Sequence, residues 1–140
     1  MRKIAKTPCK VLDAPALQDD FYLNLIDWSH DNQLAVGLGN CIYLWNAETS
    51  KVTKLCELNS DLVTSVCWAN KGSLLAVGCN KGDVCIWDVN YSKQIRKMGG
   101  HDSRVGAMTW NSKILATGSR DKLILQRDIR APYDHTHRLA

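Results

Sequence analysis

The sequence contains no apolar run that approaches the ~18 residues needed to cross a membrane, and no apolar stretch follows its first three residues. These absences predict a chain without a membrane span or a signal peptide. Catalytic motifs are missing as well, since there is no G-x-S-x-G, no phosphate-binding glycine loop and no H-E-x-x-H. Adjacent Asp19 and Asp20 would point in opposite directions on an extended chain, so they do not make an acid–base pair. We therefore expect no enzyme activity and no cofactor.

Cysteine is plentiful, but the spacing typical of a metal site is absent. None of the six cysteines belongs to a C-x-x-C pair or stands beside a histidine in a ligand pattern. Most lie in apolar runs, as in Val66-Cys67-Trp68, where cysteine behaves as a small buried hydrophobe. The pattern favours free thiols over a disulfide framework. It predicts no metal site and a reducing compartment, the nucleus or the cytoplasm.

No single sign of charge dominates the chain. Its 18 Lys and Arg against 14 Asp and Glu give a net charge of +4, and 45% of the residues are hydrophobic, which is typical of a soluble globular protein. The charge is uneven, at −2 for residues 1–91 and +6 for residues 92–140. The basic last third has no aromatic platform on which bases could stack, so we expect no binding to nucleic acid.

A period of about 40 residues organises the chain. The tetrapeptide Leu34-Ala35-Val36-Gly37 returns as Leu75-Ala76-Val77-Gly78 and as Leu115-Ala116-Thr117-Gly118. Each copy follows a short apolar segment that ends in tryptophan, and the second copy is followed by Trp87-Asp88. A Trp-Asp dipeptide at this period is typical of the WD repeat, in which one repeat forms one four-stranded propeller blade.

The sequence therefore predicts an all-β fold, a partial WD-repeat β-propeller of about three four-stranded antiparallel blades. Its length covers about three and a half repeats, so we expect an open array and not a closed ring. Outer strands are expected at residues 51–58 and 94–98. The expected division is an N-terminal extension at 1–9, an orphan outer strand and lead-in at 10–20, blade one at 21–58, blade two at 59–98 and an incomplete blade three at 99–140. The glycines that end the repeated tetrapeptides either allow close packing of sheets or mark turns.

WD blades are often held by a buried network of a histidine, a strand Ser or Thr, a turn aspartate and the tryptophan, because buried polar groups need partners. The third unit supplies His101, Ser119 and Asp121, but Arg127 stands at the position of the tryptophan. We expect His101 to be structural and not catalytic.

Several motifs together resemble one family of WD-repeat proteins. The stretches at residues 10–15 and 19–25, which lead into Asp27-Trp28-Ser29, are similar to the start of the propeller in the Fizzy family of activators of the anaphase-promoting ubiquitin ligase. Residues 35–41 with Tyr43-Leu44-Trp45, Arg104-Val105-Gly106, and residues 118–130 resemble its Fizzy-related branch, in which Arg127 is expected. The resemblance covers residues ~8 to ~131.

This resemblance implies a non-catalytic propeller that binds destruction-box and KEN-box degrons of cell-cycle proteins and presents them to the anaphase-promoting complex. A destruction box supplies an Arg and, three residues later, a Leu, so its receptor needs a carboxylate beside an apolar pocket. The matching positions are Asp13 for the Arg, Leu12 and Tyr43 for the Leu pocket beside Trp45, and Asp20 and Phe21 for the KEN box. From the residues alone, Asp13 is first a turn former before Ala14-Pro15, and only the resemblance reverses that order.

The family has seven blades, so the resemblance also implies that one wall of the degron groove, the upstream ligase-docking box and the C-terminal Ile-Arg tail are missing. We interpret the chain as a truncated activator. The alternatives are a generic WD-repeat scaffold that self-associates through exposed sheet edges and the blade faces left unpaired at its two ends, or a fragment of a longer activator.

Overall fold

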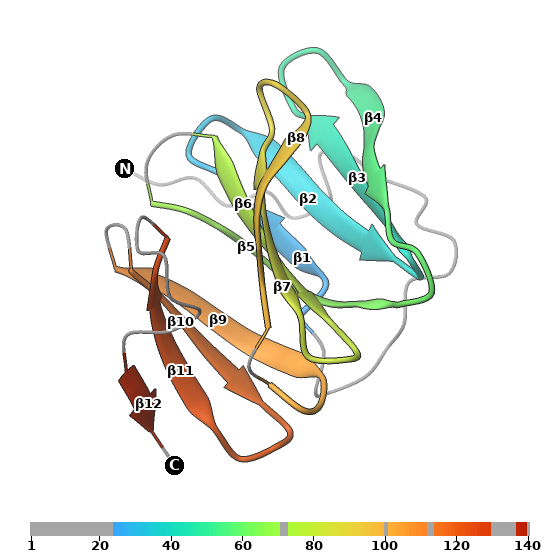
Figure 1. Ribbon diagram of the computed structural model, residues 1–140. Helices are drawn as coiled ribbons and strands as arrows, with labels where there is room; N and C mark the ends of the chain where they lie inside the picture. The colour runs from blue at the N-terminus through green and yellow to red at the C-terminus, as the bar shows by residue number, and fades with distance from the viewer. Residues whose placement is uncertain (1–23, 71–72, 100, 112–113, 130–136, 140) are drawn as a thin grey trace, which may run out of the picture.

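The computed structural model describes residues 24–70, 73–99, 101–111, 114–129 and 137–139. These residues contain strands and no helix, and the strands form three separate four-stranded antiparallel sheets (Figure 1). The first sheet holds β1 (Ile26–Trp28), β2 (Gln33–Leu38), β3 (Cys41–Asn46) and β4 (Lys51–Glu57). The second holds β5 (Val63–Trp68), β6 (Leu74–Cys79), β7 (Val84–Asp88) and β8 (Lys93–Met98). The third holds β9 (Val105–Asn111), β10 (Ile114–Ser119), β11 (Ile124–Asp128) and β12 (His137–Leu139).

The all-β class and the open array of three blades are thereby confirmed. Strands β4 and β8 occupy the two segments expected to be outer strands. The third sheet differs from the expectation. No outer strand was expected there, but the three-residue β12 pairs with β11 and completes the sheet. A strand this short carries too little alternation to be recognised from sequence. The division of the chain into an extension and three numbered blades stays a prediction.

Each sheet is a simple meander, because strands that follow one another in the chain pair with one another. Tight turns make this possible. Gly82, between β6 and β7, has φ +103°, and a Cβ there would lie 2.7 Å from the carbonyl carbon of His101. Only glycine fits this backbone conformation. The turn of the second sheet can therefore lie against the loop that leads into the third.

Two apolar cores join the sheets. The first lies between the first and second sheets and includes Leu25, Ile42, Val66 and Val77. The second lies between the second and third sheets and includes Ile86, Met98, Val105, Trp110 and Leu115. The chain therefore builds the same kind of sheet-to-sheet contact twice, with the middle sheet covered on both faces.

The three repeated glycines divide into two classes. A Cβ at Gly37 would lie 2.7 Å from Cγ1 of Val63, and one at Gly78 would lie 2.9 Å from the carbonyl oxygen of Val105. Both glycines thus permit a close approach of the next sheet. A Cβ at Gly118 would meet nothing closer than 3.7 Å, at Ala107. The close-packing interpretation holds for the first two positions and not for the third.

Candidate functional site

One face of the first sheet carries an apolar surface on which two predicted degron-binding residues lie. The strand register places Ile26, Val36 and Tyr43 in one row across β1, β2 and β3, and Trp28, Leu34 and Trp45 in the next row. Directly paired residues share a face of the sheet, and Val52 extends the second row onto β4. We call this surface the open face of the first sheet. Its members are Ile26, Trp28, Leu34, Val36, Tyr43, Trp45 and Val52.

This surface is exposed even though its residues are apolar. Ile26 is 49% exposed, Trp28 53% and Val52 62%, while Leu34 and Trp45 are buried. None of these residues belongs to the core between the first and second sheets. Among the residues that the structure describes, no sheet packs on this side. An apolar patch of this kind marks an interaction surface more often than a scattered exposed side chain does.

The two tryptophans on this face, Trp28 and Trp45, contact each other. Their ring centroids lie 5.7 Å apart with an angle of 71° between the planes, so the rings meet edge to face. This arrangement is the one that aromatic quadrupoles favour. Trp28 shields Trp45, and Tyr43 lies two residues before Trp45 on the same strand and on the same face. The register thus places Tyr43 and Trp45 on one face, and the Leu pocket itself stays a prediction.

The remaining predicted site residues, Leu12, Asp13, Asp20 and Phe21, lie outside the described part of the chain. The described edge of the open face carries one ion pair, between Nζ of Lys54 and Oε2 of Glu57 at 3.5 Å. Cys41 and Glu57 raise the pKa of Lys54, so this amine stays protonated at neutral pH. The carboxylate of Glu57 at this edge is thus already paired with a cation.

A buried polar network holds the third sheet, as expected. One ring nitrogen of His101, Nδ1, lies 3.2 Å from Oδ2 of Asp121, and the other, Nε2, lies 2.8 Å from Oγ1 of Thr117. Burial and the nearby Arg127 lower the pKa of His101, although Asp121 acts to raise it. The ring is therefore neutral, donating from Nδ1 to the carboxylate and accepting from the Thr117 hydroxyl. Such a fully engaged histidine has a structural role.

The turn aspartate is held just as firmly. The backbone N–H groups of Asp102 and Leu123 each donate to a carboxylate oxygen of Asp121, at 2.9 Å. Burial acts to raise the pKa of Asp121, but these two donors and His101 outweigh it and lower the pKa. The carboxylate therefore stays ionised in the folded state and fixes the loop around the histidine.

Sequence reasoning named Ser119 as the hydroxyl of this network and missed Thr117. In the structure Ser119 donates instead to the backbone oxygen of Ser103 and accepts from the N–H of Asp121. The signal for Thr117 was present, because the repeat Leu-Ala-Val-Gly becomes Leu-Ala-Thr-Gly only in the third unit. A polar residue at a fully buried apolar position needs a partner, and His101 provides it.

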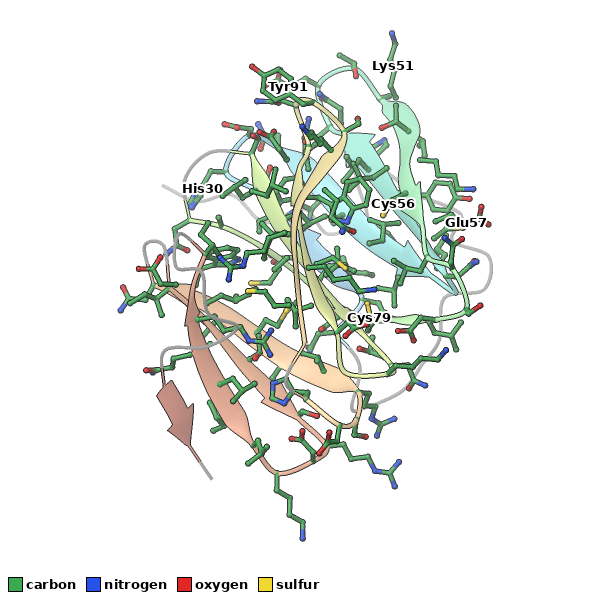
Figure 2. All side chains as sticks on the ribbon, in the orientation of Figure 1. His30, Lys51, Cys56, Glu57, Cys79 and Tyr91 are labelled. Carbon is green, nitrogen blue, oxygen red and sulfur yellow. The ribbon has the colours of Figure 1, made fainter. Side chains whose placement is uncertain are left out.

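Within the described residues Cys41, Cys56, Cys67, Cys79 and Cys85 are free thiols. Cys79 and Cys85 are buried as expected, whereas the other three are half-buried. Burial raises the pKa of Cys56 to about 12, and burial together with Asp27 raises that of Cys67 to about 11. Figure 2 shows Cys56 and Cys79 among the side chains of the sheets, whereas Tyr91 and Lys51 project from the periphery. The described part of the chain contains no group of three metal-binding side chains, and none of its elements is a helix long and apolar enough to cross a membrane.

These features define a WD-repeat β-propeller. They are the repeated four-stranded meanders, the small residues where sheets approach and the His–Asp–Thr network. Residues 10–131 match the family model described as the WDR19 first beta-propeller. The chain is 64% identical to Fizzy-related 1 of Arabidopsis thaliana and 55% identical to the anaphase-promoting complex subunit cdh1 of Dictyostelium discoideum. Each match covers 99% of this chain but only 29% and 19% of those proteins. Within the WD-repeat propellers, the chain belongs to the Fizzy-related family of anaphase-promoting complex activators and covers the N-terminal part of the propeller.

A solved structure supports the same assignment. A chain of the mitotic checkpoint complex matches with a TM-score of 0.94 and 42% sequence identity, over 99% of this chain and 43% of that one. The chain spans less than a third of the length of the curated relatives described above. One of these relatives is a subunit of the anaphase-promoting complex, and the propeller match agrees with the expectation of a non-catalytic chain.

Proposed function

We propose that this chain serves the anaphase-promoting complex as the substrate-binding part of an activator, and that it binds destruction-box peptides on the open face of the first sheet. The relatives named above support a role with this complex. The observation that carries the degron proposal is the half-buried Tyr43, which lies beside the buried Trp45 on an apolar face whose β1 residues Ile26 and Trp28 are exposed. A leucine side chain would contact this surface, with Leu12 beside it and Asp13 as the carboxylate for the arginine.

A peptide titration tests this role. A fluorescent peptide that contains Arg-x-x-Leu should bind the chain weakly, and Tyr43→Ala should weaken binding about tenfold, because one aromatic contact with a buried leucine contributes about 1–2 kcal/mol. Asp13→Ala should abolish the remaining binding. Tyr91→Ala is the matched control, since Tyr91 is 80% exposed on a turn of the second sheet. Equal affinity of the wild type and the Tyr43 variant would contradict the proposal.

A second peptide localises the contact. When the peptide leucine is replaced by alanine, Tyr43→Ala should have little further effect if the two side chains touch, because a double-mutant cycle isolates their pairwise interaction. If Tyr43→Ala weakens the binding of the alanine peptide as much as it weakens that of the leucine peptide, Tyr43 acts on another part of the ligand. Asp20 and Phe21 are proposed in the same way to contact a KEN box, and a KEN peptide with Phe21→Ala tests them.

The second candidate is a scaffold function through self-association. The observation that favours it is the set of exposed apolar residues on sheet faces that no described sheet covers, among them Ile26, Val52 and Ile124. Exposed sheet edges pair readily with other chains. We also propose a nuclear and cytoplasmic location, which the free thiols of the described residues support.

A further inference from the structure

A groove lies between the first and second sheets, and both of its walls belong to the described chain. Its volume is about 350 Å³, and it is lined mainly by β4 and by the turns between β3 and β4 and between β7 and β8. The apolar residues Leu44, Leu55 and Val89 form its floor, and all three belong to the core between these two sheets. We call it the inter-sheet groove. Its volume lies within the range of ligand pockets.

The two turns that form the walls are held in the same way. On the first sheet, Oδ1 of Asn46 accepts from the backbone N–H groups of Glu48 at 2.9 Å and Thr49 at 3.3 Å. On the second sheet, Oδ1 of Asp88 accepts from the backbone N–H of Asn90 at 3.1 Å. Side chains that bind the backbone two or three residues further on fix the conformation of a turn. The walls are therefore set before a ligand arrives, which reduces the entropy lost on binding.

Polar side chains along the groove are free to bind a ligand. Within the described part of the chain, the side chains of Gln33, Thr53 and Ser92 line the groove and make no hydrogen bond. The strand register puts Thr53 opposite Leu44, so a hydroxyl lies beside the apolar floor. Amides and hydroxyls can bind the N–H and C=O groups that an extended main chain presents. The groove thus combines an apolar floor with groups that suit a peptide backbone.

The charge along the groove is of one sign. Lys51 and Lys54 line it, and no Asp or Glu is among its described lining residues. The amine of Lys54 is paired with Glu57 at 3.5 Å. Lys51 is paired with Asn46 across β3 and β4, two residues from Leu44, so its side chain lies on the face that looks toward the second sheet. Because no described residue forms an ion pair with Lys51, its ammonium group can bind a ligand carboxylate.

The strand register sets the spacing between the apolar contact and the cation. Leu44 and Thr53 form one row across β3 and β4, and Asn46 and Lys51 form the next row on the same face. Rows two residues apart lie ~7 Å apart, which is also the distance between alternate side chains of an extended peptide. A peptide that lies along β3 therefore places one side chain at Leu44 and the next side chain on that face at Lys51.

An exposed aromatic residue stands beside the groove. Tyr91 is 80% exposed, and both of its neighbours in the chain, Asn90 and Ser92, line the groove. Figure 2 shows Tyr91 and Lys51 at the same end of the molecule, one on the second sheet and one on the first. Tyrosine is among the residues that contribute most to binding at protein interfaces.

We propose that the inter-sheet groove binds an extended segment of a partner protein in which one residue separates an aliphatic side chain from a carboxylate. The aliphatic side chain contacts Leu44 and Val89, the carboxylate pairs with Lys51, and Tyr91 contacts the segment from the second sheet. Leu44 and Tyr43 follow one another on β3, so this groove and the open face lie on opposite sides of the first sheet. The proposal therefore goes beyond degron binding and does not depend on it.

An NMR titration of the isotopically labelled full-length chain tests the proposal. The probe is the acetylated and amidated peptide Gly-Ser-Leu-Ser-Glu-Ser-Gly, which should shift the amide signals of the turn between β7 and β8 and saturate with a Kd of ~1 mM or below. Lys51→Glu should weaken binding about tenfold, because attraction becomes repulsion. Thr53→Trp fills the groove and should weaken binding by at least about tenfold. Val52→Trp is the matched control, since Val52 precedes Thr53 on β4 and faces the other side of the sheet.

Peptide variants test the two contacts separately. Replacing the peptide leucine by alanine, or moving the glutamate next to the leucine, should weaken binding. A peptide with lysine in place of glutamate should bind Lys51→Glu more tightly than it binds the wild type. Absence of saturation up to ~5 mM, or equal binding by the wild type, Lys51→Glu and Thr53→Trp, would overturn the proposal.

The degron site supplies the last control. Tyr43→Ala should bind the probe as the wild type does, and a peptide that contains Arg-x-x-Leu should not compete with the probe. Weaker binding by Tyr43→Ala, or competition between the two peptides, would overturn the proposal and place the probe on the open face of the first sheet. Failure of degron binding alone would leave all the results for the probe unchanged, so the two proposals fail separately.

Discussion

Replacing Gly78 by alanine should test the packing logic of the whole array. A Cβ at this position would lie 2.9 Å from the backbone oxygen of Val105 and 3.0 Å from the Val105 Cβ, both on the third sheet. It would also press on the Oγ of Ser65, which donates to the same Val105 oxygen at 2.6 Å. The backbone of the neighbouring sheet cannot yield as a flexible side chain would, so the two sheets must move apart.

The expected loss follows from three contributions. Overpacking a close-packed contact costs about 1–3 kcal/mol, and a weakened Ser65 hydrogen bond costs about 1 kcal/mol more. Removing a glycine from a strand returns about 0.5–1 kcal/mol. The net loss for Gly78→Ala is about 1–3 kcal/mol. Gly118→Ala makes the same chemical change at the same place in the repeat, but its Cβ would lie 3.7 Å from the Cβ of Ala107, an ordinary contact distance. This substitution should therefore leave the free energy of unfolding unchanged or raise it by about 0.5 kcal/mol.

Urea unfolding of both variants measures this difference. The midpoint for Gly78→Ala should fall at an unchanged slope, and that for Gly118→Ala should stay or rise. Equal destabilisation by the two substitutions would refute the reasoning, because it would mean that strand propensity and not sheet approach sets the requirement for glycine.

Two further predictions concern titration. Burial lowers the pKa of His101 below its usual 6.5, so its contribution to stability is complete above that pH and is lost as the pH falls below it. The urea midpoint of the wild type should therefore drop between pH 7.5 and pH 5.5. The drop should be smaller in His101→Gln, and in the control His30→Gln, at an exposed position, it should be as large as in the wild type. Because the pKa of Cys67 is about 11, its thiolate fraction at pH 8 is about a hundredfold below that of an ordinary thiol, and alkylation followed by mass spectrometry should show it reacting correspondingly slowly until the chain unfolds.

Local pattern was sufficient to predict most of the fold. The repeated tryptophans, the Leu-Ala-Val-Gly tetrapeptides and the spacing between them correspond to β1, β2, β5, β6, β9 and β10. The alternation of side chains along β3 also places Tyr43 and Trp45 on one face. These features depend only on residues close in sequence, and so the order of residues along the chain is enough to derive them.

Features that depend on distant residues could not be predicted in this way. The repeat marks Thr117 as unusual, but its choice over Ser119 as the partner of His101 depends on the distance across the third sheet, since both are hydroxyls on the same strand. Which of the repeated glycines lies against another sheet depends on what packs there, and Gly78 and Gly118 are equivalent in the repeat. Sequence shows the kind of contact, but the neighbouring sheet determines whether the contact is made.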